Sequence, residues 1–247
     1  MSQNIIYNPV CSGPGPTNGI VIFVCLMLSM IQLAPMNSVS GTKEPNYSWL
    51  ALGDSYTIGE SVLETERYPV QAVAILGKSG THFGEPEIIA RTGWTTGDLQ
   101  HALDIKKPIS RNYDVVTLLI GVNNQFQRRS RAEYQEQFSA LLKRSIALSG
   151  DRPSHVFVLS IPDYAVTPFA IQMNTKEISL EIDSFNRINK EISLFEQVNW
   201  LDITGESRKA ANDPSLVAGD GLHFSGKEYA VWASLLANMI EQKISKH

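Results

Sequence analysis

The stretch Trp49-Leu-Ala-Leu-Gly-Asp-Ser-Tyr-Thr-Ile-Gly59 joins a short apolar run to a polar turn. No polar residue interrupts Trp49–Leu52, which is typical of a strand buried on both faces of a parallel sheet. Gly53 ends the run, and Ser55 follows closely. In parallel α/β sheets the functional side chains lie beyond the carboxyl ends of the strands. The stretch therefore predicts a strand of the sheet and a candidate functional serine at its end.

Strand-like and helix-like segments alternate along the rest of the chain. The further predicted strands are Glu87–Ala90, Asp114–Ile120, His155–Ile161 and Val198–Asp202. The predicted helices are Arg131–Leu148, Glu177–Glu196 and a last helix that opens with the capping-box match Ser225-Gly-Lys-Glu228 and continues through Ile240. Strands separated by helix-length segments indicate βαβ units and a parallel sheet that is covered on both faces.

Length and composition favour one α/β domain. The chain has 247 residues, of which 43% are hydrophobic and 19% are charged, so it can bury one good core. Acidic residues outnumber basic ones by 25 to 21, the net charge is −4, and no run of Lys or Arg stands out. A nucleic-acid-binding protein normally presents a basic face, so we expect no nucleic-acid partner.

Residues 1–47 differ from the rest and are predicted to be a signal-peptide-like segment and a linker, with the folded domain over 48–247. Ile20–Ala34 is apolar but shorter than a membrane-spanning helix, and Ser38-Val39-Ser40 before Gly41 suits signal peptidase. We therefore predict export, to the periplasm or out of the cell, with membrane contact only through this segment if it is not cleaved. No Lys or Arg precedes Lys43, so the usual basic n-region is missing and a cytoplasmic location stays open.

The two cysteines, Cys11 and Cys25, both precede the predicted domain. The domain itself therefore has no disulfide, no thiolate nucleophile and no cysteine-ligated metal site. The five histidines show no His-Glu-x-x-His or similar spacing, so no metal site is predicted.

A candidate general base precedes the last predicted helix, in Asp220-Gly-Leu-His223. A serine hydroxyl is a weak nucleophile at neutral pH and needs a base that titrates near pH 7. An Asp three residues earlier can orient the imidazole across the glycine turn. Taken alone, a loop histidine is more often a surface residue, and a lone serine after a strand is more often a helix cap.

Two further strand ends carry candidate hydrogen-bond donors. Gly93 follows the second strand and offers its backbone N–H, and Asn123 follows the third and offers a side-chain amide. Such donors can stabilise an oxyanion, although glycine and asparagine also favour plain turns. The four features occur in chain order at strand ends or before the last helix, and together they favour a catalytic site.

The chain resembles the SGNH/GDSL hydrolase family over Ser48–Ile244. Its matches to the family blocks are Gly53-Asp54-Ser55, Gly93, Gly121-Val-Asn123, and Asp220-Gly-Leu-His223. Tyr56 replaces the family's Leu, and Asn124 replaces an Asp that is not a triad member, so the hydrogen bonding around Asn124 must differ. Thr57 rules out the Gly-x-Ser-x-Gly elbow of α/β-hydrolases.

The resemblance implies an α/β protein with a three-layer α/β/α fold and a flavodoxin-like sheet of about five parallel strands. It also implies a carboxylic ester hydrolase that needs no cofactor, with small acyl esters, lipid esters or acetylated sugars as substrates. Ser55 would be the nucleophile, His223 the general base and Asp220 its partner. The backbone N–H groups of Ser55 and Gly93 and the amide of Asn123 would form the oxyanion hole.

The residues support three other interpretations less well. The domain could be a catalytically inactive flavodoxin-like binding or scaffold module, although the complete set of candidate residues argues against that. No Gly-x-Gly-x-x-Gly or P-loop follows a strand, which disfavours nucleotide or flavin binding. Glu85 and Glu87 would face opposite ways on one strand, which disfavours a glycosidase. The loop after Pro162 is a candidate lid. Within this loop, Tyr164, Phe169 and Met173 are candidate residues of the acyl pocket.

Overall fold

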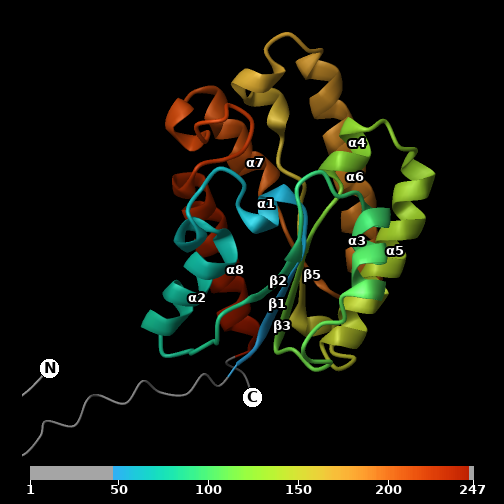
Figure 1. The fold of residues 1–247 in the computed structure, drawn as a ribbon, viewed down its shortest axis with the longest axis vertical. Coiled ribbons are helices and arrows are strands. Elements are labelled where there is room, and N and C mark those ends of the chain that lie inside the picture. Colours follow the sequence, from blue (N-terminus) through green and yellow to red (C-terminus); the bar gives the residue numbers. More distant parts are fainter. Residues whose placement is uncertain (1–46, 245–247) are drawn as a thin grey trace, which may run out of the picture. The chain divides into compact units, whose positions relative to one another are not determined.

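The computed structural model describes residues 47–244, and within them five strands form one parallel sheet in the order β2-β1-β3-β4-β5 (Figure 1). The predictions for an apolar segment at 20–34 and a cleavage site at 38–40 lie outside the described residues. Tyr47, the last residue of the predicted linker, forms an isolated parallel bridge with Phe83.

All five predicted strands are confirmed. They are β1 (Trp49–Gly53), β2 (Glu87–Ala90), β3 (Val115–Leu119), β4 (Val156–Leu159) and β5 (Asn199–Leu201). Every residue of β1, β3 and β4 is buried, and their sequences are apolar apart from Thr117 in β3. The strand order is that of the flavodoxin-like doubly wound sheet, so the predicted fold class is confirmed.

Helices cover both faces of the sheet. The α-helices are α1 (Ser55–Ile58), α2 (Tyr68–Lys78), α3 (Thr96–Ile105), α4 (Val122–Phe126), α5 (Arg131–Leu148), α6 (Thr175–Phe195), α7 (Thr204–Ser207) and α8 (Gly226–Ile244). Figure 1 shows α2 and α8 side by side on one face, and α3, α5 and α6 on the other. The short helices α1 and α4 directly follow β1 and β3, so both lie at the carboxyl edge of the sheet.

Short 3-10 helices complete the chain between these elements. They are η1 (Glu64–Glu66), η2 (Pro153–His155), η3 (Tyr164–Val166), η4 (Pro168–Ala170), η5 (Arg208–Ala211) and η6 (Pro214–Leu216). Two of them, η3 and η4, occupy the loop after Pro162, and Tyr164 and Ala170 in that loop are buried. The candidate lid is therefore packed against the domain in this structure.

The prediction for the start of the last helix was wrong in one respect. Ser225 Oγ accepts a weak hydrogen bond from the Glu228 backbone N–H at 3.5 Å. The Glu228 carboxylate, however, accepts from Trp232 Nε1 at 2.7 Å, so the reciprocal half of a capping box is absent. Both Glu228 and Trp232 are buried, so the carboxylate binds the indole N–H, and the Ser225 backbone N–H donates to the Leu216 carbonyl instead. Within residues 47–244, no helix is long and apolar enough to span a membrane.

Candidate active site

Ser55 is held at the carboxyl end of β1 by the short helix that it begins. The Asp54 side chain caps this helix and accepts a hydrogen bond from the Tyr56 backbone N–H at 3.1 Å. Ser55 is only 5% exposed, and it borders a small cavity. As the first residue of the helix, it has a backbone N–H that no carbonyl of the helix can accept. Ser55 therefore presents a hydroxyl and a backbone donor together.

His223 and Asp220 are joined in a compact turn. The His223 Nδ1 lies 2.6 Å from Asp220 Oδ2. The other carboxylate oxygen accepts hydrogen bonds from the backbone N–H groups of Leu222 and His223, each at 2.9 Å. With Nδ1 donating to the carboxylate, the neutral imidazole has its free lone pair on Nε2, which is the form that a general base needs.

The Asp220 carboxylate is stabilised in its charged form. Burial by itself would raise its pKa, but hydrogen bonds from His223, the Leu222 N–H and Ser61 hold that pKa well below its usual range. Ser61 Oγ donates at 2.7 Å to the same oxygen that binds the imidazole. Asp220 therefore stays ionised at neutral pH and can stabilise a protonated His223.

Gly93 and Asn123 come from different strand ends and line the same small cavity. Gly93 has a φ of 83°, a left-handed conformation that glycine adopts without strain. Asn123 Nδ2 donates to the Trp94 carbonyl at 3.0 Å, and Gln127 Nε2 donates to the Gly93 carbonyl at 3.3 Å. The bond to Trp94 uses one of the two N–H groups of the Asn123 amide, which leaves the second available to another acceptor.

One cavity of about 120 Å³ brings four of the predicted residues together: Ser55, Gly93, Asn123 and His223. Asp220, the fifth, lies behind His223 through the bond described above. Apolar side chains enclose the rest of the cavity, among them the predicted Tyr164 and Phe169. Within the described part of the chain, Ser55 Oγ makes no hydrogen bond to His223, and such contacts in unliganded hydrolases are often long until substrate binds.

Asn124, the residue that replaces the family's Asp, is a structural neighbour of this cavity. Its side chain is buried, its Oδ1 accepts from the Thr96 backbone N–H at 3.0 Å, and its Nδ2 donates to Thr96 Oγ1 at 2.7 Å. These two bonds tie α4 to the start of α3. The hydrogen bonding around position 124 was expected to differ from that of the family's Asp. It differs in that the Asn124 amide accepts one hydrogen bond and donates another, whereas a carboxylate only accepts.

Asp54 has an unusual environment that the sequence analysis did not anticipate. It is 1% exposed, and its Oδ2 has no hydrogen-bond partner among the described residues. Burial raises the pKa of its carboxyl to about 7, although hydrogen bonds from backbone N–H groups, that of Tyr56 first, oppose the shift. Its place beside Ser55 was the only signal in the sequence, because burial arises from the tertiary fold.

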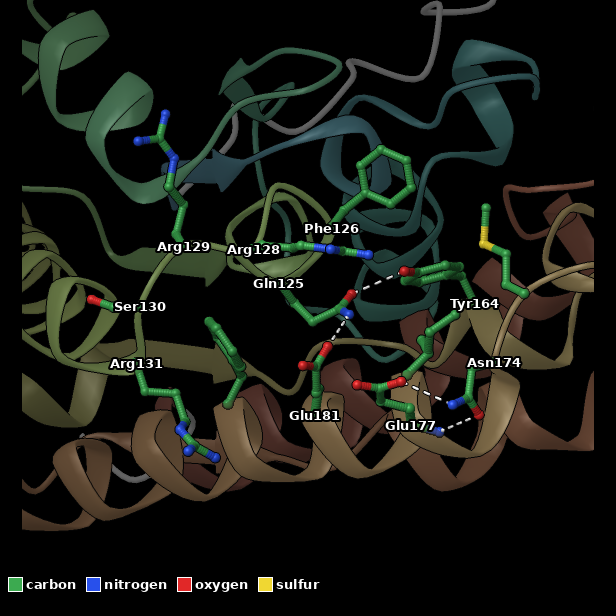
Figure 2. A pocket seen from close by; sticks show the side chains of 13 residues that line it. Gln125, Phe126, Arg128, Arg129, Ser130, Arg131, Tyr164, Asn174, Glu177 and Glu181 are labelled. Carbon is green, nitrogen blue, oxygen red and sulfur yellow. Dashed lines mark hydrogen bonds between the residues drawn. The ribbon is translucent and has the colours of Figure 1, made fainter.

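A second cavity, of about 770 Å³, adjoins the first and shares Phe126 and Tyr164 with it (Figure 2). The predicted Met173 lies here and not in the smaller cavity. Three arginines, at positions 128, 129 and 131, also line this cavity, and they come from one short basic stretch, Arg128-Arg129-Ser-Arg131, to which the sequence analysis gave no role. Among the described residues, no group of three or more His, Cys, Asp or Glu could hold a metal ion.

Comparison with known proteins identifies a family. The profile of the GDSL-like lipase/acylhydrolase family matches residues 51–231. No curated protein sequence matches the chain. The matched range includes all five candidate residues, from Ser55 to His223.

Solved structures with the same fold are distant in sequence. A lipase/acylhydrolase from Enterococcus faecalis is 20% identical, with a TM-score of 0.58, covering 79% of this chain and 96% of its own. An acetylxylan esterase from Geobacillus stearothermophilus is 17% identical, with a TM-score of 0.58 and coverage of 82% and 95%. A lipase from the goat rumen metagenome is 18% identical, with a TM-score of 0.62 and coverage of 78% and 97%. At these identities the likeness shows the fold.

The buried Asp54 carboxyl generates a prediction about stability. Its pKa is raised from 3.8 to about 7, so between these values the folded state holds a proton that the unfolded chain has lost. The resulting stability is fully present below pH 4 and is lost as the pH rises through 7, and roughly 2–3 kcal/mol should disappear between pH 5 and pH 8. Asp54→Asn cannot titrate and should lack this part of the pH dependence.

Thermal melts at pH 5 and pH 8 measure the effect. The melting temperature of the wild-type protein should fall more between these pH values than that of Asp54→Asn. The exposed Asp151, changed to Asn, serves as the matched control and should behave as wild type. Equal pH dependence in wild type and Asp54→Asn would show that Asp54 is already ionised at pH 5.

Proposed function

The chain belongs to the GDSL-like lipase/acylhydrolase family, and on that premise we propose that it is a serine esterase acting on small-molecule carboxylic esters. One observation carries the proposal: Ser55 and His223 border the same cavity, and Asp220 Oδ2 lies 2.6 Å from His223 Nδ1. A hydroxyl, an imidazole with its Nε2 free and an ionised carboxylate are the groups that acyl transfer through a covalent intermediate requires. Small acyl esters, lipid esters and acetylated sugars remain the candidate substrates.

The first half-reaction forms an acyl-enzyme. Ser55 Oγ attacks the carbonyl carbon of the ester, and His223 Nε2 takes the hydroxyl proton as the new C–O bond forms. The tetrahedral intermediate collapses, the bond to the alcohol oxygen breaks, and His223 returns the proton to that oxygen. The alcohol then leaves, with the acyl group bound to Ser55.

The second half-reaction regenerates the serine. A water molecule attacks the acyl carbon while His223 takes its proton, and Ser55 Oγ leaves and recovers that proton. In both halves the carbonyl oxygen becomes an oxyanion. The backbone N–H groups of Ser55 and Gly93 and the free N–H of the Asn123 amide would stabilise this charge. The bond from Asn123 to the Trp94 carbonyl holds the amide in place beforehand, so little reorganisation is needed.

Ser55→Ala should abolish ester hydrolysis and leave the fold intact, because the nucleophile is removed from a position where alanine fits. Two measurements test the role of Ser55. The first is hydrolysis of 4-nitrophenyl acetate, and the second is labelling by a fluorophosphonate, with the labelled residue identified by mass spectrometry. Wild type should be labelled on Ser55 alone, and the variant not at all. Labelling of another residue, or persistent activity in the variant, would rule out this serine as the nucleophile. A folded wild-type protein that turns over no ester would instead favour the binding or scaffold module.

Asp220→Asn should reduce kcat less than His223→Ala does. His223 moves the proton in every step, whereas Asp220 orients and stabilises it, and the backbone N–H of His223 still bonds to an amide oxygen at position 220. Steady-state kinetics on the two variants provide the comparison. If the two variants are equally inactive, the carboxylate does more than orient the imidazole.

Asn123→Ala should lower kcat with little change in KM, because its donor acts on charge that exists only near the transition state. We expect a loss of about 10²–10³ in kcat. Asn124→Ala is the matched control. It removes the two buried bonds to Thr96, so it should lower the melting temperature and largely spare kcat. A loss of turnover in Asn124→Ala alone would mean that the donor is misassigned by one residue.

A further inference from the structure

We propose that the ester substrate carries an anionic group, a carboxylate or a phosphate, on its acyl part, and that Arg128 binds this group in the larger cavity. The inference rests on the proposed esterase function, and it adds the charge of the substrate and the residue that selects it. The shared border at Phe126 and Tyr164 allows one substrate to lie across both cavities.

The position of the larger cavity assigns it to the acyl part. His223 must face the leaving oxygen to protonate it, so the alcohol lies on the side of the Asp220–His223 turn. The larger cavity includes no residue of that turn and instead begins at Gln125, just after the oxyanion donor Asn123. The acyl group points in this remaining direction, past Phe126.

Arg128 has the features of a binding residue. Figure 2 shows its side chain extending across the cavity in the direction of Tyr164, whereas Arg129 points away from it. No hydrogen bond or ion pair engages the Arg128 guanidinium within residues 47–244, unlike Arg144 and Arg208, whose guanidiniums are paired with aspartates. Its φ of 57° is a left-handed conformation at the end of α4, where glycine or asparagine would be the less strained choice.

The acidic residues of the cavity do not pair with Arg128. Glu181 Oε2 accepts from Gln125 Nε2 at 2.6 Å, and Glu177 Oε2 accepts from Asn174 Nδ2 at 2.9 Å. Figure 2 shows both glutamates on the helix at the opposite wall from Arg128. With Arg129 directed away, Arg128 and Arg131 face two glutamates in the cavity, and both glutamates are hydrogen-bonded to amides. Arg128 is therefore the cation of this lining that is free to bind an anion, close in sequence to Phe126 at the border with the smaller cavity.

The floor between the two cavities is apolar. Phe126 is 49% exposed, and its ring lies 6.1 Å from Tyr164 and 6.2 Å from Phe169. Methylene groups can pack on these rings, but a charge there would lose its water. Arg128 follows the end of α4 by two residues, beyond the Phe126 ring, so a flexible chain of methylene groups such as that of adipic acid is suited to cross this apolar floor.

The test compares matched esters that differ only in charge. The anionic ester is the mono-4-nitrophenyl ester of adipic acid, and its neutral counterpart is the 4-nitrophenyl ester of adipic acid monoamide. We expect wild type to prefer the anionic ester by about 3- to 10-fold in kcat/KM, the scale of one charge-assisted hydrogen bond near the surface. Added salt should reduce the preference, because the guanidinium is exposed to solvent.

Three variants locate the effect. Arg128→Gln should remove the preference by lowering kcat/KM for the anionic ester to about the value for the neutral ester. Glu181→Gln should increase the preference, because it removes a negative charge from the same cavity. Arg187→Gln is the control: it removes an exposed arginine of α6 that does not line the cavity, and it should leave the preference intact.

Two results would overturn the inference. Equal kcat/KM for the two adipic esters, unaffected by Arg128→Gln, would show that no anion is selected, while the esterase function itself would stand. A second pair, 4-acetoxybenzoate and 4-acetoxybenzamide, places the charge on the alcohol part. If Arg128 were needed for a preference for the anionic ester in this second pair and not in the adipic pair, the larger cavity would hold the alcohol part of the substrate. If the protein cleaves no ester, or if Ser55→Ala cleaves esters as well as wild type does, the proposed esterase function itself is wrong.

Discussion

The site depends on one constraint, the parallel alignment of β2, β1 and β3. The pairs Gly53 with Ala90 and Gly53 with Leu119 are in register, so the three strands end at the same level. The residues that follow them, Ser55, Gly93 and Asn123, are therefore delivered to a single edge although they are far apart in sequence. Gly121, with a φ of 133°, turns the chain sharply there, and a Cβ at this position would approach Tyr134 and Ile161 side chains to 2.7 Å. The sheet thus brings together the proposed nucleophile and the two proposed oxyanion donors before any specific side-chain contact is considered.

The imidazole reaches this edge by a different route. His223 lies in a loop ahead of α8, and backbone bonds hold the loop: the Ala218 N–H donates to the His223 carbonyl at 2.8 Å, and the Phe169 N–H donates to the Gly221 carbonyl at 2.9 Å. The second bond joins the segment after β4 to the loop that holds His223. Phe169 also borders both the catalytic cavity and the aromatic floor beside it. The wall of the cavity at Phe169 and the loop that holds His223 are thus joined by a backbone hydrogen bond.

The sequence was informative where a local pattern determined the structure. Trp49–Leu52, Asp114–Ile120 and His155–Ile161 gave the buried strands because burial on both faces leaves a nearly continuous apolar run. Arg131–Leu148 became α5 because burial of one helical face leaves apolar residues at a period of about 3.6. Helices α2 and α3 show a weaker helical pattern of apolar residues in the sequence. Pro69 lies near the start of α2, and Gly97 and Asp98 lie in the first turn of α3, and these residues are unusual inside a helix. The family blocks predicted Ser55, Asp220 and His223 as site residues, and the arginines at 128, 129 and 131 follow Phe126 directly in the sequence. The burial of Asp54, and the placing of these arginines around one cavity with the glutamates of α6, depend instead on contacts between distant segments. No local pattern could indicate them.

The central claim is that the reaction passes through an acyl group on Ser55, and trapping that species tests it most directly. The protein would be mixed with 4-nitrophenyl acetate, stopped in acid during turnover, digested and analysed by mass spectrometry. The account predicts an acetyl group on the peptide that contains Ser55, formed and lost at rates that match release of the two products. An acetyl group carried during turnover by a different residue would contradict it.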